Sequence, residues 1–189
     1  MLPSLSNSSQ GLFLSFIAGS FYYFSYKINE QLGSWAVHSQ GISLIFLPAG
    51  IKHLSILLAG GWGALGCFAA LFLLASSFWQ ESHPLTILLY CLVSTGSTWF
   101  GVWLSLKILG IPADLENLRF IHLPQMDFIA ATAHAIIINL FFIMASMKTS
   151  HVVSNYFAML LGDYIGSFII LTIFWLMLTI FNKSSLKNY

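Results

Sequence analysis

The chain has 189 residues, of which 58% are hydrophobic and 7% are charged, with a formal net charge of +1 at pH 7. A soluble domain carries about 25% charged residues, so a soluble monomer would leave too much apolar surface in water. The small net charge also excludes the basic surface with which proteins bind nucleic acid. The sequence therefore predicts an integral membrane protein with the lipid bilayer as its surroundings and no nucleic-acid partner.

Six apolar segments follow one another along the chain. Each is close to the ~20 residues that a helix needs to cross about 30 Å of hydrocarbon. Long runs without period-two alternation favour helices over the strands of a barrel. The sequence thus predicts an all-α, polytopic fold in which residues 1–189 form one membrane domain, a single bundle of about six transmembrane helices. The predicted spans are residues 11–28, 42–59, 61–79, 85–108, 126–147 and 156–181.

The second segment admits two interpretations, because Pro48 interrupts it and the pair Gly60-Gly61 follows it directly. With almost no loop before the third segment, we predict a tight antiparallel helical hairpin. In the alternative, residues 42–59 are re-entrant and do not span the bilayer. Proline is tolerated in spanning helices whose neighbours pair the freed carbonyl, so both interpretations stay open.

Basic residues indicate the orientation of the chain. With six spans, both termini lie on one side of the membrane, and that side carries more Lys and Arg than the other. Cytoplasmic segments carry this excess, so we predict cytoplasmic termini. The basic residues on the side of the termini are Lys107, Arg119, Lys183 and Lys187, against Lys27 and Lys148 on the other side.

Small residues recur at helical spacing in three of the segments. Helices in lipid approach one another through such side chains, so we interpret these rows as packing seams inside the bundle. In the alternative, one seam faces a helix of another protein. The members are Gly63 and Gly66 in the third segment, Ser94, Thr98 and Gly101 in the fourth, and Gly162 and Gly166 in the sixth.

Two charged side chains lie inside predicted spans at matched depth. Lys52 and Asp163 both fall roughly 12–15 Å below the same face, at 1.5 Å per residue. An ionisable group inside a membrane costs about 2.5–3.5 kcal/mol on insertion scales, and pairing with an opposite charge offsets most of that. We predict a Lys52–Asp163 ion pair inside the bundle. In the alternative, Lys52 extends to the cytoplasmic interface and Asp163 lines a small wet pocket.

Three further polar side chains, His53, His134 and Asn139, lie inside the predicted helices. Such residues most often bond across to a neighbouring helix. The alternative is a pocket that they line together with Lys52 and Asp163. That pocket would hold a small polar ligand and respond to pH through its histidines.

Catalytic motifs are missing from the sequence: it has no HExxH pair, no glycine-rich phosphate loop and no nucleophile elbow. Cys67 and Cys91 lie inside apolar runs without paired spacing, which favours packing over metal binding. We interpret Asp114, Glu116 and Asp127 as solvated charges. The sequence predicts no enzyme activity, no metal site and no cofactor.

The stretches GISLIFLPAGIKHLSILLAGGWGALG and MLLGDYIGSFIIL resemble the membrane-associated sensor domain of the first type. Pro48, Ala49 and Gly50 match that family's Pro-Ala-Gly element, which precedes a glycine-rich turn. Gly162 and Asp163 match the Gly-Asp element that opens the family's last helix.

Two departures from the family matter. Leu47 stands where a second proline is common, and the family's cytoplasmic output domain is absent. The resemblance implies a multi-pass module of the bacterial inner membrane that acts through another membrane protein. We expect a non-enzymatic, sensor-like or accessory module that docks onto partner integral membrane proteins and binds a small polar ligand. The alternatives are the substrate-binding membrane component of a vitamin-type transporter, with residues 27–41 closing its pocket, and a structural subunit of a larger membrane complex.

Overall fold

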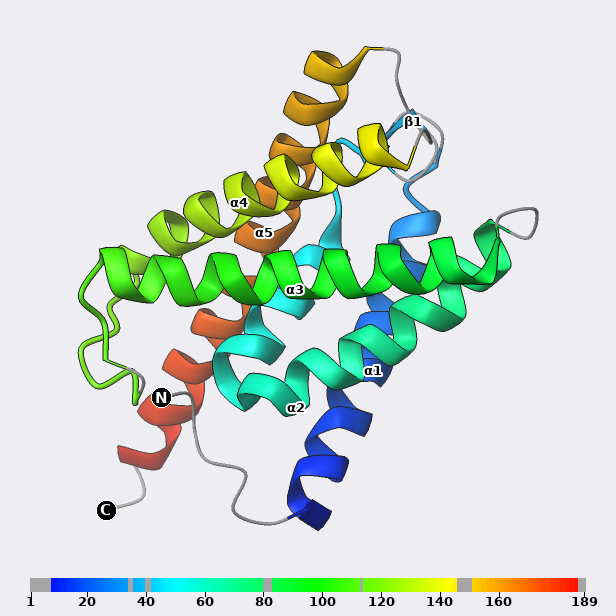
Figure 1. Ribbon diagram of the computed structural model, residues 1–189. Coiled ribbons are helices and arrows are strands. Elements are labelled where there is room, and N and C mark those ends of the chain that lie inside the picture. The colour runs from blue at the N-terminus through cyan, green and yellow to red at the C-terminus, as the bar shows by residue number, and fades with distance from the viewer. Residues whose placement is uncertain are drawn as a thin grey trace.

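The computed structural model describes residues 8–33, 36–39, 42–79, 83–112, 114–145 and 151–186, with side chains described as far as residue 180. Within these ranges the chain forms five helices and one small antiparallel ribbon (Figure 1). The elements are α1 (Ser8–Glu30), β1 (Val37–Ser39), β2 (Ile42–Ser43), α2 (Leu47–Phe78), α3 (Pro84–Ile108), α4 (His122–Met144) and α5 (Val152–Leu186).

Four of the described helices are long and apolar enough to cross a membrane, which supports a helical membrane protein but not six spans. The first predicted span lies in α1, whose serine, tyrosine and charged residues make it less apolar than the others. The second and third predicted spans both lie in α2, and Ile42 and Ser43 belong to β2 instead. The four candidate spans are Leu47–Phe78, Pro84–Ile108, His122–Met144 and Val152–Ile180.

Helix α2 is broken at Gly60, whose φ of 56° and ψ of −128° are not helical. Glycine adopts this conformation readily because it has no Cβ. The chain turns back so sharply that a Cβ on Gly63 would collide with the carbonyl oxygen of Ser55. The first arm, from Leu47 to Ala59, rises roughly 20 Å, which is shorter than the ~30 Å hydrocarbon core. The re-entrant interpretation of this arm therefore stays open beside the hairpin.

The broken helix α2 lies at the centre of the bundle. It packs against α1, α3 and α5, while α4 packs against α3 and α5. One apolar cluster joins α1, α2 and α3 around Tyr22 and Cys91, and a second joins α2, α3 and α4 around Ile56 and Ala130. Every other helix is thus positioned by contact with α2 or with a neighbour of α2.

The predicted packing residues lie at contacts inside the bundle. At four of the glycines, an added Cβ would come within 3 Å of an atom in another element or in the chain segment before α2, so two backbones approach closely there. Ser94 and Thr98 are buried on the inner face of α3. The contacting pairs are Gly66 with Ser15, Gly101 with Ala130, Gly162 with Ser43 and Gly166 with Phe46.

The connection between α1 and α2 forms the β1–β2 ribbon, which the sequence did not predict. Its backbone groups pair with each other, as a non-helical segment beside a membrane requires. The Asn29 Oδ1 atom accepts a hydrogen bond of 2.9 Å from the Leu47 amide and so satisfies a free donor at the start of α2. The Phe46 amide donates to the Gly162 carbonyl at 2.9 Å, which connects the segment between the ribbon and α2 to α5.

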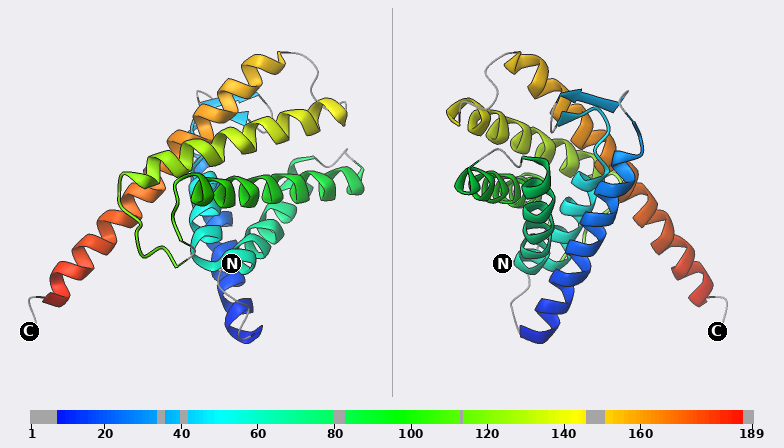
Figure 2. Two further views of the ribbon diagram at one scale, coloured as in Figure 1. Left: turned by 60° about the vertical axis from the view of Figure 1, so that its left-hand side comes forward. Right: turned by 90° about the vertical axis from the view of Figure 1, so that its right-hand side faces the viewer.

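The C-terminal part of α5 leaves the bundle, as both views in Figure 2 show. Its apolar side chains are exposed, among them Ile173, Leu176 and Ile180. In a membrane this surface faces lipid.

The break in α2 predicts unequal effects of alanine at two adjacent glycines. Gly60→Ala forces a side chain into a conformation that costs roughly 1–3 kcal/mol. Gly61→Ala places its Cβ 3.5 Å from the Trp99 ring, which is ordinary contact. Thermal unfolding in detergent, followed by tryptophan fluorescence, should show a midpoint several degrees lower for Gly60→Ala and little change for Gly61→Ala. Equal midpoints would mean that the turn does not need glycine.

Candidate functional site

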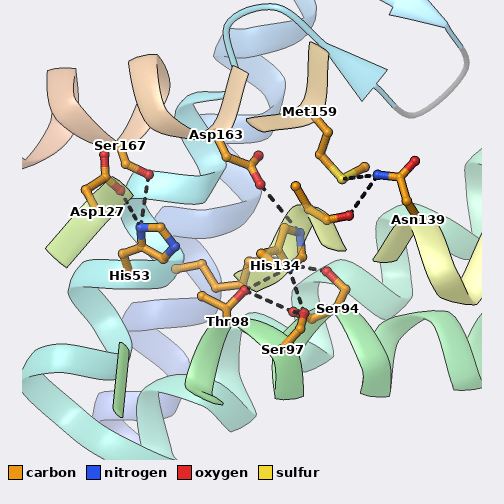
Figure 3. A network of polar contacts seen from close by, with 12 residues as sticks. His53, Ser94, Ser97, Thr98, Asp127, His134, Asn139, Met159, Asp163 and Ser167 are labelled. Carbon is orange, nitrogen blue, oxygen red and sulfur yellow. Dashed lines mark hydrogen bonds and ion pairs between the residues drawn. The ribbon is translucent and has the colours of Figure 1, made fainter. Parts of the chain in front are cut away.

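Nine polar side chains from four helices gather inside the bundle and are exposed by only 0% to 7% (Figure 3). We call this group the polar network. Because no bulk water reaches it, each member depends on the others for its hydrogen bonds. It consists of Lys52 and His53 on α2, Ser94, Ser97 and Thr98 on α3, Asp127 and His134 on α4, and Asp163 and Ser167 on α5.

One end of the network joins α2, α4 and α5 through His53. The His53 Nδ1 atom lies 2.8 Å from Asp127 Oδ1 and 3.1 Å from Ser167 Oγ. Asp127 Oδ2 has no hydrogen-bond partner among the described residues. A cavity of about 20 Å³ borders both Asp127 and His53. This space is large enough for one water molecule, which would satisfy the free oxygen.

The other end joins α3, α4 and α5 through His134. The His134 Nε2 atom lies 3.6 Å from Asp163 Oδ2, and its Nδ1 atom lies 2.7 Å from Ser97 Oγ and 3.3 Å from Thr98 Oγ1. Both hydroxyls also lie within hydrogen-bond distance of the Ser94 carbonyl oxygen, at 3.0 Å and 2.9 Å. Each hydroxyl has one proton to donate, so two arrangements fit these contacts. Ser97 donates to the Ser94 carbonyl and the imidazole proton is on His134 Nδ1, or Ser97 donates to Nδ1 and the imidazole proton is on Nε2, facing Asp163.

The tautomer of His134 sets the character of its contact with Asp163. With the proton on Nε2, the imidazole points an N–H group at the Asp163 carboxyl, 3.6 Å away, which is too long for a direct hydrogen bond. At the other end of the network, His53 contacts the Asp127 carboxyl. The buried Lys52 side chain and the two carboxyl groups carry opposite charges when ionised, so their grouping lowers the cost of charge in a membrane interior.

The predicted ion pair between Lys52 and Asp163 is not formed. Lys52 Nζ donates a hydrogen bond of 3.0 Å to Ser94 Oγ on α3, and no contact within 4.0 Å joins it to Asp163. The lysine points toward α3, whereas the carboxyl on α5 faces α4. The Lys52 ammonium thus contacts α3 and the Asp163 carboxyl contacts α4, although both belong to the polar network.

Asn139 lies apart from the network, although the sequence grouped it there. Its Nδ2 atom donates to the Ala135 carbonyl at 2.8 Å and lies 3.8 Å from the Met159 sulfur. These contacts stay on α4 and at its contact with α5, so Asn139 helps to hold that helix pair together.

The structure corrects the prediction for Asp127 and adds two serines to the site. Asp127 is 1% exposed inside α4 and is not a solvated loop charge. One signal was present in the sequence, because Asp127 precedes His134 by seven residues and so shares its helix face. Ser97 and Ser167 carry no such signal, since serine is also an ordinary packing residue in membrane helices.

A Ser–His–Asp arrangement is present in Ser97, His134 and Asp163, and it raises the question of catalysis. A nucleophilic serine must reach its substrate. Ser97 is 3% exposed. It lines neither the small cavity beside Asp127 nor the larger cavity at the ends of α1 and α2. The arrangement therefore serves as a link between helices in this conformation of the protein.

A cavity of about 500 Å³ lies at another place, where α1 and α2 end and α3 begins, beside the β1–β2 ribbon; we call it the end cavity. Most of its lining is apolar or aromatic. Part of the lining comes from the segment that the sequence analysis expected to close a pocket. From that segment come Glu30, Gly33, Val37 and Ser39; the aromatic lining residues are Tyr26, Phe46, Phe78, Trp79 and Tyr90.

The end cavity and the polar network are linked through α3. Tyr90 lines the cavity, and Ser94, one turn later on the same helix face, binds Lys52. The Tyr90 ring also stacks on Phe142 of α4, with ring centres 5.9 Å apart. A displacement of Tyr90 would therefore change the packing of α3 and α4, which both carry residues of the network.

Comparison of the chain with protein-family models, curated proteins and solved structures gives no match. The resemblance of Pro48–Gly50 and Gly162–Asp163 to the membrane-associated sensor domain of the first type stays a prediction.

The His53–Asp127 contact predicts an energetic coupling between α2 and α4. Removing one member of a buried pair costs about 3–5 kcal/mol, so Asp127→Ala should destabilise strongly. The exposed Glu116→Ala is the control and should change stability by less than about 0.5 kcal/mol. A double-mutant cycle with His53→Ala, measured by unfolding in mixed micelles, should give a coupling of about 0.5–3 kcal/mol. Additive effects would show that the two side chains do not interact.

Proposed function

We propose that this protein is a non-enzymatic, sensor-like membrane module that binds a small molecule in the end cavity and responds through the polar network. The observation that carries this proposal is the position of the cavity one helical turn from the network, with Tyr90 and Ser94 on one face of α3. A molecule in the end cavity would therefore lie one helical turn from the network.

The end cavity has the properties of a small-molecule site. Its volume of about 500 Å³ falls within the roughly 300–1,000 Å³ typical of ligand pockets. Apolar and aromatic walls with a few polar groups, here Asn29, Glu30 and Ser43, are the usual lining of such sites. The β1–β2 ribbon contributes Val37 and Ile42, so a short segment outside the helices borders the site.

The polar network has the properties of a response element. It connects four helices through two groups of directional contacts, one around His53 and one around His134, and within each group a change in one contact alters the partners of the next. Two of its carboxylate oxygens, on Asp127 and Asp163, have no hydrogen-bond partner among the described residues. The Asp163 Oδ2 atom lies 3.6 Å from His134 Nε2, just beyond hydrogen-bond distance, so a small shift of α4 against α5 would form or lose this contact.

The signal would pass to another integral membrane protein, since we expect no catalytic activity in this chain. The predicted location in the bacterial inner membrane and the predicted cytoplasmic termini belong to this proposal. An alternative function is the substrate-binding component of a vitamin-type transporter, favoured by Gly33, Val37 and Ser39, which line the end cavity from the connection between α1 and α2. Transport requires release on the opposite side and an energy-coupling partner, whereas sensing requires neither.

The proposal is tested by what the protein retains when it is extracted in polymer nanodiscs without detergent. Mass spectrometry of the extract should find a small molecule in stoichiometric amount. Ala75→Phe fills the end cavity from α2 and should remove that molecule. Leu92→Phe, on the exposed face of α3, is the control and should retain it. A molecule retained equally by all three proteins, or by none, would contradict the proposal. A co-purified ATPase together with the molecule would favour transport.

A further inference from the structure

We propose that the end cavity selects a small organic cation, a substituted ammonium with an apolar or aromatic body. This inference rests on the proposed ligand-binding role and adds the chemical class of the ligand. It follows from two observations on the lining: the sign of its one charged group and the identity of its rings.

The charge in the lining is negative. Among the described residues that border the end cavity, Glu30 is the charged one, and no lysine, arginine or histidine accompanies it. Lys27 neutralises the Glu30 Oε2 atom at 2.8 Å, but Lys27 does not line the cavity and its ammonium also lies 5.9 Å above the Tyr23 ring. That ion pair is exposed and therefore weak. A ligand cation near Glu30 would therefore share the carboxylate with Lys27 or displace it from an exposed ion pair, whereas the described lining offers an anion no positive group.

The aromatic side chains add a second preference for a cation. Tyr26 contacts Phe46 and Phe78 edge to face, with ring centres 6.3 Å and 6.4 Å apart. Trp79 and Tyr90 form a second edge-to-face pair at 4.5 Å. Tryptophan and tyrosine rings attract ammonium groups most strongly, and several rings around one site are the usual receptor for a quaternary ammonium.

The wall of the end cavity on α2 explains why the body of the ligand would be apolar. This wall consists of Leu71, Leu74 and Ala75, which precede Trp79 in the chain. They offer no hydrogen bonds through their side chains. A ligand that fills about 500 Å³ therefore needs an apolar portion against α2 and its cation near Glu30 and the rings.

The test compares two probes of nearly the same shape. One is benzyldimethyl(hydroxyethyl)ammonium, and the other is its uncharged analogue in which carbon replaces the nitrogen. Binding to the full chain in nanodiscs is measured by titration calorimetry, with Ala75→Phe subtracted as the filled-cavity blank. We expect at least tenfold tighter binding of the cation. Glu30→Gln and Trp79→Leu should each weaken the cation at least fivefold, while the exposed Glu116→Gln should leave both affinities unchanged.

The same cation is present in lipid headgroups, so the titration is repeated in nanodiscs of phosphatidylcholine and of phosphatidylglycerol. Weaker cation binding in phosphatidylcholine identifies the choline headgroup as a competitor, and equal binding identifies a free cation; both results support the proposed class. Equal affinity for the two probes, or an affinity unchanged by Glu30→Gln, would overturn it. If the protein retains a native metabolite that Ala75→Phe loses but shows no cation preference, the binding role stands and the ligand class is wrong. If nothing is retained and neither probe binds, both proposals fail.

Discussion

The need to neutralise charge away from water governs the interior of this protein. A single unpaired carboxylate or ammonium among membrane helices costs several kcal/mol, and the described part of this chain buries two carboxyl groups and one lysine. The His53 imidazole contacts Asp127, and the His134 imidazole contacts Asp163. Ser94 accepts a hydrogen bond from Lys52. Since each contact joins different helices, neutralising the charges also determines which helices lie together.

The broken helix α2 makes this arrangement possible. The first arm ends at Gly60 and carries Lys52 and His53 into the centre of the bundle. The second arm turns back and extends to Trp79, where it forms a wall of the end cavity. A continuous helix would place Lys52 and Trp79 roughly 40 Å apart, at 1.5 Å per residue. Because of the turn, the first arm of α2 carries the buried charged residues and the second arm lines the end cavity, and both arms stay inside the same bundle.

The sequence indicates which residues are buried better than it indicates their partners. Hydropathy identifies the apolar helices. The four ionisable residues that the sequence places inside the spans, Lys52, His53, His134 and Asp163, are buried in the structure. Matching Lys52 to Asp163 by depth was wrong, because that argument treats all helices as parallel to one axis. The helices cross at large angles in Figure 1, so equal residue counts do not give equal depth. Rotation of each helix about its axis depends on packing, which one sequence does not reveal.

Ser94 lies between Lys52 and the hydroxyls that contact His134. Its hydroxyl accepts from Lys52, and its carbonyl oxygen lies within hydrogen-bond distance of the Ser97 and Thr98 hydroxyls. A movement of α3 that changes Ser94 therefore changes the Lys52 contact and the hydroxyls that orient His134 together. A displacement of Tyr90, one turn from Ser94 on the same face of α3, would therefore affect both the lysine contact and the hydroxyls beside His134.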